Sequence, residues 1–141
     1  MKIFLWFAIL FLLGSIGCTN SGNTRMKGVA VRESKLRESW QHNQLSTYEY
    51  LSASIDLAHD KSVIRFDRHK ALLTRYPKWV PGFHSRPDTK LRNSIAEAYA
   101  MGRIGDSEYE SLMAQISVLL DRWGDQRRIL TKERFKLGYP R

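Results

Sequence analysis

Apolar residues recur at spacings of three and four positions along most of the chain. This is the spacing of one face of an amphipathic α-helix. Polar segments, glycines and prolines interrupt the pattern and divide it into separate helices. The pattern predicts five helices, over residues 29–44, 46–59, 62–75, 88–102 and 106–123. We therefore predict a mainly α protein, a small bundle of about five helices.

Polar residues that accept hydrogen bonds from free backbone amides mark the expected helix starts. Ser46, with Glu49 three positions later, predicts a capping box in which each side chain bonds the other residue's amide. The same reasoning predicts caps at Asp60 or Ser62, at Asp88 or Thr89, and at Asp106 or Ser107, with Glu110 completing a second box. Glycines at 102 and 105 are expected to supply the unusual backbone angles of the turn before the last helix.

The segment YPKWVPGFHSRPD, Tyr76–Asp88, contains three of the four prolines. Because proline restricts the backbone, we expect a stiff loop that is not helical. Its aromatic and basic side chains make it a candidate partner-binding element, with Trp79, Phe83, His84 and Arg86 as the candidate residues. The alternative is that Trp79 and Phe83 fold back over the helical core.

The first residues have the layout of a signal peptide. Lys2 is followed by eleven apolar residues, IFLWFAILFLL, and then by small residues up to Cys18. A membrane-spanning helix needs about 20 apolar residues, so we expect cleavage rather than a permanent anchor. Residues 19–28 are polar, contain glycine and have no hydrophobic period, which predicts a short flexible tether.

SIGC, Ser15–Cys18, resembles the lipobox of bacterial lipoproteins. The resemblance implies that the Cys18 thiol carries a diacylglycerol, that cleavage occurs before it, and that the new amino terminus is acylated. Residues 1–17 are then the signal peptide, 18–28 an acylated tether, and 29–141 a helical domain. Ser15 departs from the leucine that is commonest at that place in the family. Thr19 stands where an Asp would imply retention at the inner membrane, so the outer membrane is favoured.

The chain is basic, with 23 Lys and Arg against 14 Asp and Glu. From Cys18 onward the expected net charge is +8, because only Lys2 is lost with the leader. This charge favours an anionic membrane surface or an acidic envelope protein as partner. The tail after Trp123 is basic too, and we expect it to fray, to continue as a solvated helix, or to lie on an anionic surface.

Few residues are arranged for chemistry. Cys18 is the only thiol, so no internal disulfide is possible, and no two histidines have a metal-binding spacing. The nearest candidate cluster, interpreted as surface salt bridges, is Asp56, His59, Asp60, Asp67 and His69. We predict no catalytic residue, no metal, no cofactor and no small-molecule substrate. Export and an acidic start to the last helix disfavour nucleic acid.

The hypothesis from sequence is a non-enzymatic lipoprotein that acts by binding. Its size and layout resemble small accessory lipoproteins of the bacterial envelope, and among these we favour the exclusion proteins of plasmids. The alternatives are a pilot protein of a secretion system, whose groove would be lined by the aromatics of the Tyr76–Asp88 loop, and an activator of cell-wall synthesis. An enzyme acting on peptidoglycan is the third alternative, and it requires His59, Asp60 and Asp67 to converge in a cleft.

Overall fold

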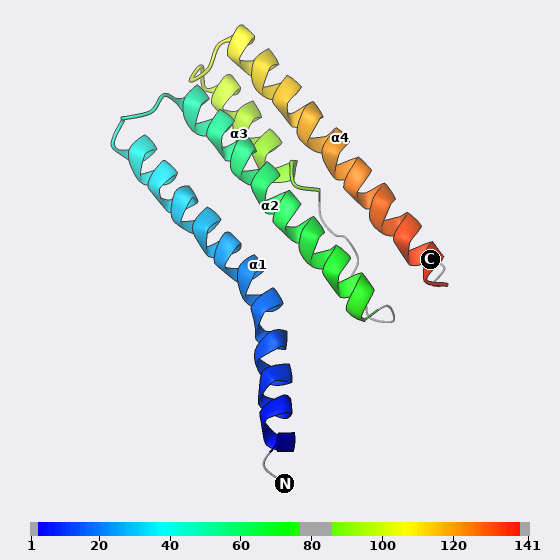
Figure 1. Ribbon diagram of the computed structural model, residues 1–141. Helices are drawn as coiled ribbons and strands as arrows, with labels where there is room; N and C mark the ends of the chain where they lie inside the picture. The colour runs from blue at the N-terminus through cyan, green and yellow to red at the C-terminus, as the bar shows by residue number, and fades with distance from the viewer. Residues whose placement is uncertain (1–2, 77–85, 139–141) are drawn as a thin grey trace.

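The chain forms an extended bundle of helices (Figure 1). The structure, a computed structural model, describes the backbone of residues 3–76 and 86–138 and the side chains of residues 22–76 and 86–138. Within these ranges there are four helices and no strand: α1 (Ile3–Gln41), α2 (Thr47–Arg75), α3 (Thr89–Ala100) and α4 (Asp106–Lys136). The prediction of a mainly α bundle is confirmed, but the number of helices is four rather than five.

Helix α2 lies at the centre of the bundle, with α1 on one side and α3 and α4 on the other (Figure 1). Hydrogen bonds from Ser52 to Gln115 and from Ser62 to Gln126 show that α2 and α4 run parallel. Helix α3 runs in the opposite direction between them, and α1 is antiparallel to α2. Among the described helices, α1 contacts α2 alone, whereas α3 contacts both α2 and α4.

The two helices predicted over residues 46–59 and 62–75 are one continuous helix, α2. The predicted break is wrong because residues 58–63 contain neither glycine nor proline. Ser62 does not cap a helix; it is buried, and its hydroxyl donates to the side-chain carbonyl of Gln126 at 2.8 Å. A polar residue that resembles a helix start in the sequence is therefore a buried contact between α2 and α4.

The largest hydrophobic cluster, which we call the main core, joins α2, α3 and α4. Its buried members are all aliphatic: Leu51, Ile55, Ile95, Ala98, Ile104, Leu112, Ile116 and Leu119. Ile104 belongs to the short turn between α3 and α4, which also contains Gly102 at a φ of +66°. The turn is therefore held from inside by an apolar side chain. The prediction of an unusual backbone angle is confirmed for Gly102 but is wrong for Gly105, whose backbone is extended with φ −88° and ψ 175°.

A second and smaller cluster, which we call the α1–α2 seam, consists of buried Val29, Leu57 and Ile64, with Met26 and Leu36 packed beside them. The predicted irregular tether at residues 19–28 is not seen, because α1 is helical from Ile3 to Gln41. Met26 and Val29 lie three positions apart and both pack on α2. Residues 19–28 contain one apolar residue, Met26, and so show no hydrophobic period in the sequence. They are nevertheless helical, because they continue the helix that packs on α2 from Val29 onward.

The start of α2 is the predicted capping box. The amide of Glu49 donates to the Ser46 hydroxyl at 3.1 Å, and the amide of Ser46 donates to the Glu49 carboxylate at 2.7 Å. These hydrogen bonds from Ser46, the backbone bond first, lower the pKa of Glu49. The box fixes where α2 begins and confirms the sequence prediction.

The predicted caps of α4 are wrong. The helix is preceded by Gly105, whose amide donates to the Glu108 carboxylate at 2.9 Å, so the reciprocal acid is Glu108 and not Glu110. Asp106 accepts a hydrogen bond from the hydroxyl of Tyr99 at 2.8 Å, and this bond is the main cause of the raised pKa of Tyr99. Asp106 thus ties the end of α3 to the start of α4.

Helix α4 continues past Trp123 to Lys136, so most of the basic tail is helical. This confirms the prediction of a continued helix and contradicts fraying up to Lys136. Leu130 is buried in this half of α4. Burial of one large aliphatic residue favours the helical state over fraying.

Candidate functional site

The predicted site residues fall into two groups. Trp79, Phe83 and His84 lie outside the described residues, and the side chain of Cys18 does too, although its backbone belongs to α1. Arg86 is described, and it lies just before α3 with 55% of its side chain exposed. The described parts of the candidate partner-binding element are therefore Tyr76, at the end of α2, and the residues from Arg86 to the start of α3.

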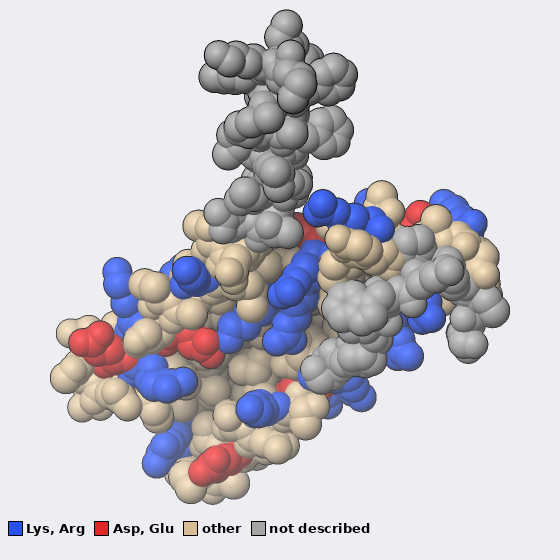
Figure 2. All heavy atoms as spheres, turned by 90° about the horizontal axis from the view of Figure 1, so that it is seen from below, with Lys and Arg blue, Asp and Glu red and all other residues tan. Residues whose placement is uncertain are grey.

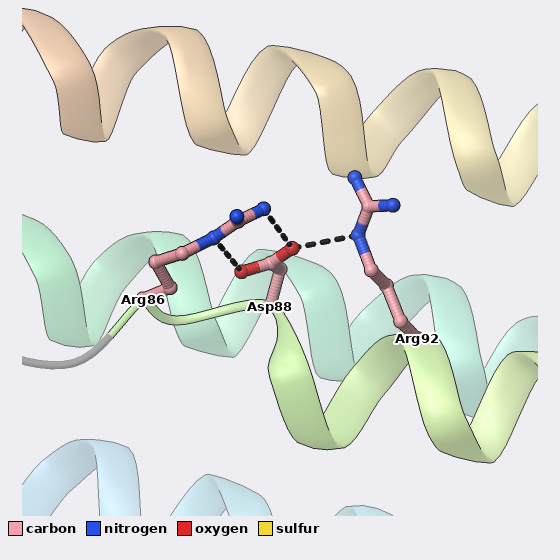
Figure 3. A network of polar contacts seen from close by, with 3 residues as sticks. All are labelled: Arg86, Asp88 and Arg92. Carbon is pink, nitrogen blue, oxygen red and sulfur yellow. Dashed lines mark hydrogen bonds and ion pairs between the residues drawn. The ribbon is translucent and has the colours of Figure 1, made fainter.

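Arg86 belongs to a polar cluster with Asp88 and Arg92 (Figure 3). Asp88 immediately precedes α3, and its side chain is only 1% exposed. Its carboxylate accepts from Arg86 Nε at 3.2 Å and Nη2 at 3.0 Å, and from Arg92 Nε at 2.6 Å. The two guanidinium groups therefore flank one buried carboxylate.

Asp88 was predicted as a helix cap, and its side chain makes no capping hydrogen bond. Its backbone is already helical, with φ −93° and ψ −19°, and its carbonyl accepts from the Arg92 amide at 2.8 Å. A capping side chain needs an extended backbone, so the carboxylate points to the arginines instead. The position is predicted correctly, but the role is not.

The charge state of Asp88 depends on its two partners. Burial by itself raises the pKa of this carboxyl group, but hydrogen bonds from Arg86 and Arg92 outweigh burial, so the pKa lies below its usual range. The carboxylate is therefore ionised at neutral pH. Because it is buried, losing either arginine partner leaves it less compensated.

Chemically, the cluster presents two oriented cations. The side chains of Arg86 and Arg92 remain 55% and 42% exposed while Asp88 restrains both. Guanidinium groups bind carboxylate and phosphate through paired N–H donors, and restraint lowers the entropy lost on binding. The cluster suits recognition of an acidic group. Sequence reasoning missed Arg92, although an acid followed by arginine four positions later at a helix start is a recognisable signal.

The candidate titratable cluster on α2 does not converge. Asp60 forms an ion pair with Arg32 at 2.6 Å, and Asp67 forms one with Arg25 at 2.9 Å. His59 faces the other side of α2 and contacts Arg122 of α4 at 2.8 Å. The salt-bridge interpretation is confirmed for both acids, and their partners are arginines of α1.

The remaining members of that cluster are Asp56, which is exposed, and His69, whose Nδ1 lies 2.8 Å from the Arg65 carbonyl. In the described side chains, no three His, Cys, Asp or Glu residues are grouped as metal ligands.

No helix in the same part of the chain is both long and apolar enough to cross a membrane. Comparisons with protein-family models, curated proteins and solved structures found no match to this chain.

Proposed function

We propose that this chain is a lipoprotein of the bacterial envelope, anchored by acyl chains on Cys18, that acts by binding a partner and not by catalysis. The observation that carries the proposal is the sequence of the leader, in which eleven apolar residues and a run of small residues end at the only thiol. Two or three acyl chains hold a protein on a membrane far longer than one chain does.

The course of α1 supports an anchor that positions the bundle. The helix includes both Cys18 and Val29, the first buried residue of the α1–α2 seam. At 1.5 Å per residue these positions are about 17 Å apart along the helix axis. An acyl group on Cys18 would therefore hold the bundle close to the bilayer on a helical link, about half the reach of an extended chain of the same length.

A binding role is supported by the oriented pair Arg86 and Arg92 beside the Tyr76–Asp88 loop. Among envelope processes we favour plasmid exclusion, because a helical body held near the membrane suits the masking or blocking of a surface. The favoured membrane is the outer one, on the basis of Thr19.

The anchor is tested by feeding radiolabelled palmitate to cells that express the full chain. We expect label in the wild type, none in Cys18→Ala, and unchanged labelling in Thr19→Ala, the matched control next to it. An unlabelled wild type, or labelling that survives in Cys18→Ala, would show that the lipid assignment is wrong.

The process is tested by conjugation into recipients that carry or lack the gene. Exclusion predicts fewer transconjugants when the recipient expresses the wild-type chain, and loss of this effect in Cys18→Ala. Equal transfer into both recipients removes exclusion while leaving the lipid anchor untouched.

A further inference from the structure

Charge is distributed unevenly along the bundle. We define the basic half as residues 22–32 of α1, 60–76 of α2 and its end, and 123–138 of α4 and its end. It contains thirteen Lys and Arg against four Asp and Glu. The other described residues, 33–59 and 86–122, contain seven Lys and Arg against ten Asp and Glu. The net charge of +9 is therefore not spread evenly over the molecule.

The three segments of the basic half lie side by side. Arg25 of α1 pairs with Asp67 of α2, and Ser62 of α2 bonds Gln126 of α4. In Figure 1 this is the half at which α1 enters the bundle and α2 and α4 end. In the view from below, blue Lys and Arg side chains clearly outnumber red Asp and Glu side chains (Figure 2). The fold therefore gathers cations from segments that are far apart in the sequence.

The four acids of the basic half are all engaged. Asp60 and Asp67 pair with arginines of α1, Asp125 with Arg128, and Glu133 with Lys136. Eight cations of this half have no acidic partner within the described part of the chain: Lys27, Arg65, Arg68, Lys70, Arg75, Arg127, Lys132 and Arg134. All but Arg134 are exposed. Their charge is therefore available to an anionic surface.

We infer that the basic half binds the anionic phospholipid headgroups of the membrane that holds the chain. The inference rests on the proposed anchor in one respect, which is the position of the bilayer. Cys18 precedes Gly22, the first described residue of the basic half, by one helical turn, about 6 Å along α1. A lipid on Cys18 thus places this half, and not the acidic half, next to the headgroups.

The energetics suit an anchored protein. Each cation near an anionic leaflet strengthens binding by roughly fivefold, and this effect falls off within about 10 Å at moderate salt. Acyl anchoring makes the contact intramolecular, so a few such cations are enough to orient the bundle. The same anionic surface repels the half of the bundle that has an excess of acids. This repulsion turns the acidic half away from the bilayer.

The test is lysine footprinting of the full chain in vesicles, with a water-soluble amine-acylating reagent and mass spectrometry. Lys70 and Lys132 report on the basic half, and the exposed Lys35 and Lys90 are internal controls in the other half. In vesicles containing phosphatidylglycerol we expect the labelling rates of Lys70 and Lys132 to fall roughly tenfold relative to phosphatidylcholine vesicles. High salt should restore them, and Lys35 and Lys90 should not change.

A pair of variants separates a specific surface from general attraction. Arg65→Glu with Arg68→Glu should abolish the protection of Lys70, whereas Arg37→Glu with Arg103→Glu, the same charge change on exposed residues of the other half, should leave it intact. Circular dichroism checks that both double variants remain helical. If either variant is not helical, the wild-type footprint in the two lipids still tests the inference.

The inference is overturned if the labelling rate of each of the four lysines is the same in phosphatidylglycerol and in phosphatidylcholine vesicles. It is also overturned if added duplex DNA protects Lys70 and Lys132 but phosphatidylglycerol does not, a result that would identify a nucleic-acid surface. A failure of the proposed anchor is detected by a different experiment, as the absence of palmitate label in cells. The footprint instead compares two lipid compositions for protein that is already bound to vesicles.

Discussion

The main core and the α1–α2 seam hold the same central helix by different means. On one face of α2, eight buried aliphatic residues from α2, α3, α4 and the Ile104 turn form a continuous cluster. On the other face three buried residues are flanked by ion pairs of Arg25, Arg32 and Lys61. The side chains of Arg25 and Arg32 are more than half exposed, and that of Lys61 is half-buried. Apolar burial is worth about 25 cal/mol per Å², whereas an exposed ion pair contributes about 0–1 kcal/mol.

Helix α1 is therefore the separable part of the fold. Among the described helices it contacts α2 alone, and its seam is small and polar at its borders. Near the far end of α1, Trp40 stacks on Tyr50 with ring centroids 4.7 Å apart, which ties that end to the start of α2. Helices α2, α3 and α4 should therefore form the stable unit, and α1, the helix that contains Cys18, should open first.

The largest effect is expected in the main core. Leu112 and Ile116 are fully buried, so Leu112→Ala or Ile116→Ala should lower the free energy of unfolding by about 2–5 kcal/mol. Denaturant unfolding followed by circular dichroism measures this loss. Val118→Ala on the exposed face of the same helix is the control, with an expected change within about 0.5 kcal/mol. Similar losses in both variants would mean that α4 does not bury this face.

The next effect concerns the polar cluster of Arg86, Asp88 and Arg92 at the start of α3. Asp88→Asn removes a buried carboxylate and should cost about 1–3 kcal/mol at neutral pH. Because the pKa of Asp88 is lowered on folding, its ionised form stabilises the fold above the ordinary Asp pKa of about 3.9, and this contribution is lost as pH falls through the lowered value.

The measurement is the free energy of unfolding of both proteins between neutral pH and the acid limit of folding. The difference between wild type and Asp88→Asn should be full at neutral pH and should shrink only below about pH 4. If the difference in the free energy of unfolding stays constant down to that limit, the two arginines do not stabilise the ionised form of Asp88.

A smaller effect is expected at the seam. Val29→Ala removes two buried methyl groups and should cost about 1–2 kcal/mol at most. Amide hydrogen exchange should accelerate across residues 22–41 of α1 while α2, α3 and α4 keep their protection. Val31→Ala, exposed on the same helix, should leave the exchange unchanged. Acceleration throughout the bundle would contradict the view that α1 opens separately.

The smallest effect is expected for the ion pairs that border the seam. A double-mutant cycle on Arg32→Ala and Asp60→Ala should give a coupling of about 0.2–1 kcal/mol that decreases with added salt. The sum of the two single changes, measured by denaturant unfolding, provides the reference. A coupling that salt does not alter would show that this exposed pair is more shielded than its geometry indicates.

Local patterns account for the parts of the fold that were predicted well. The mainly α class, the Ser46–Glu49 capping box and the left-handed Gly102 each depend on neighbours within four residues. The error at Ser62 has a distant cause, because its buried partner Gln126 lies 64 residues further along the chain. The error at Asp88 has a local cause: its backbone is helical, and its carboxylate bonds two arginines within four residues.

The candidate site shows the same division. Arg86 was identified from the basic and aromatic character of its loop, but its restraint by Asp88 and the companion role of Arg92 required the start of α3 to be placed. Asp60 and Asp67 form the predicted salt bridges, but the sequence does not indicate their partners on α1. Arg25 lies in the segment without a hydrophobic period, and Arg32 lies in a predicted helix whose packing partner is not known from sequence.

By itself the sequence determined helicity, the overall positive charge and the apolar N-terminal stretch before Cys18, because these follow from composition and from spacings of a few residues. Only the tertiary structure decided that one helix serves as the centre of the bundle and that cations from α1, α2 and α4 share one half of the molecule. The physical reason is that the direction of a helix is set by packing against residues distant in the sequence. Charged side chains from different helices form one surface only once those directions are fixed.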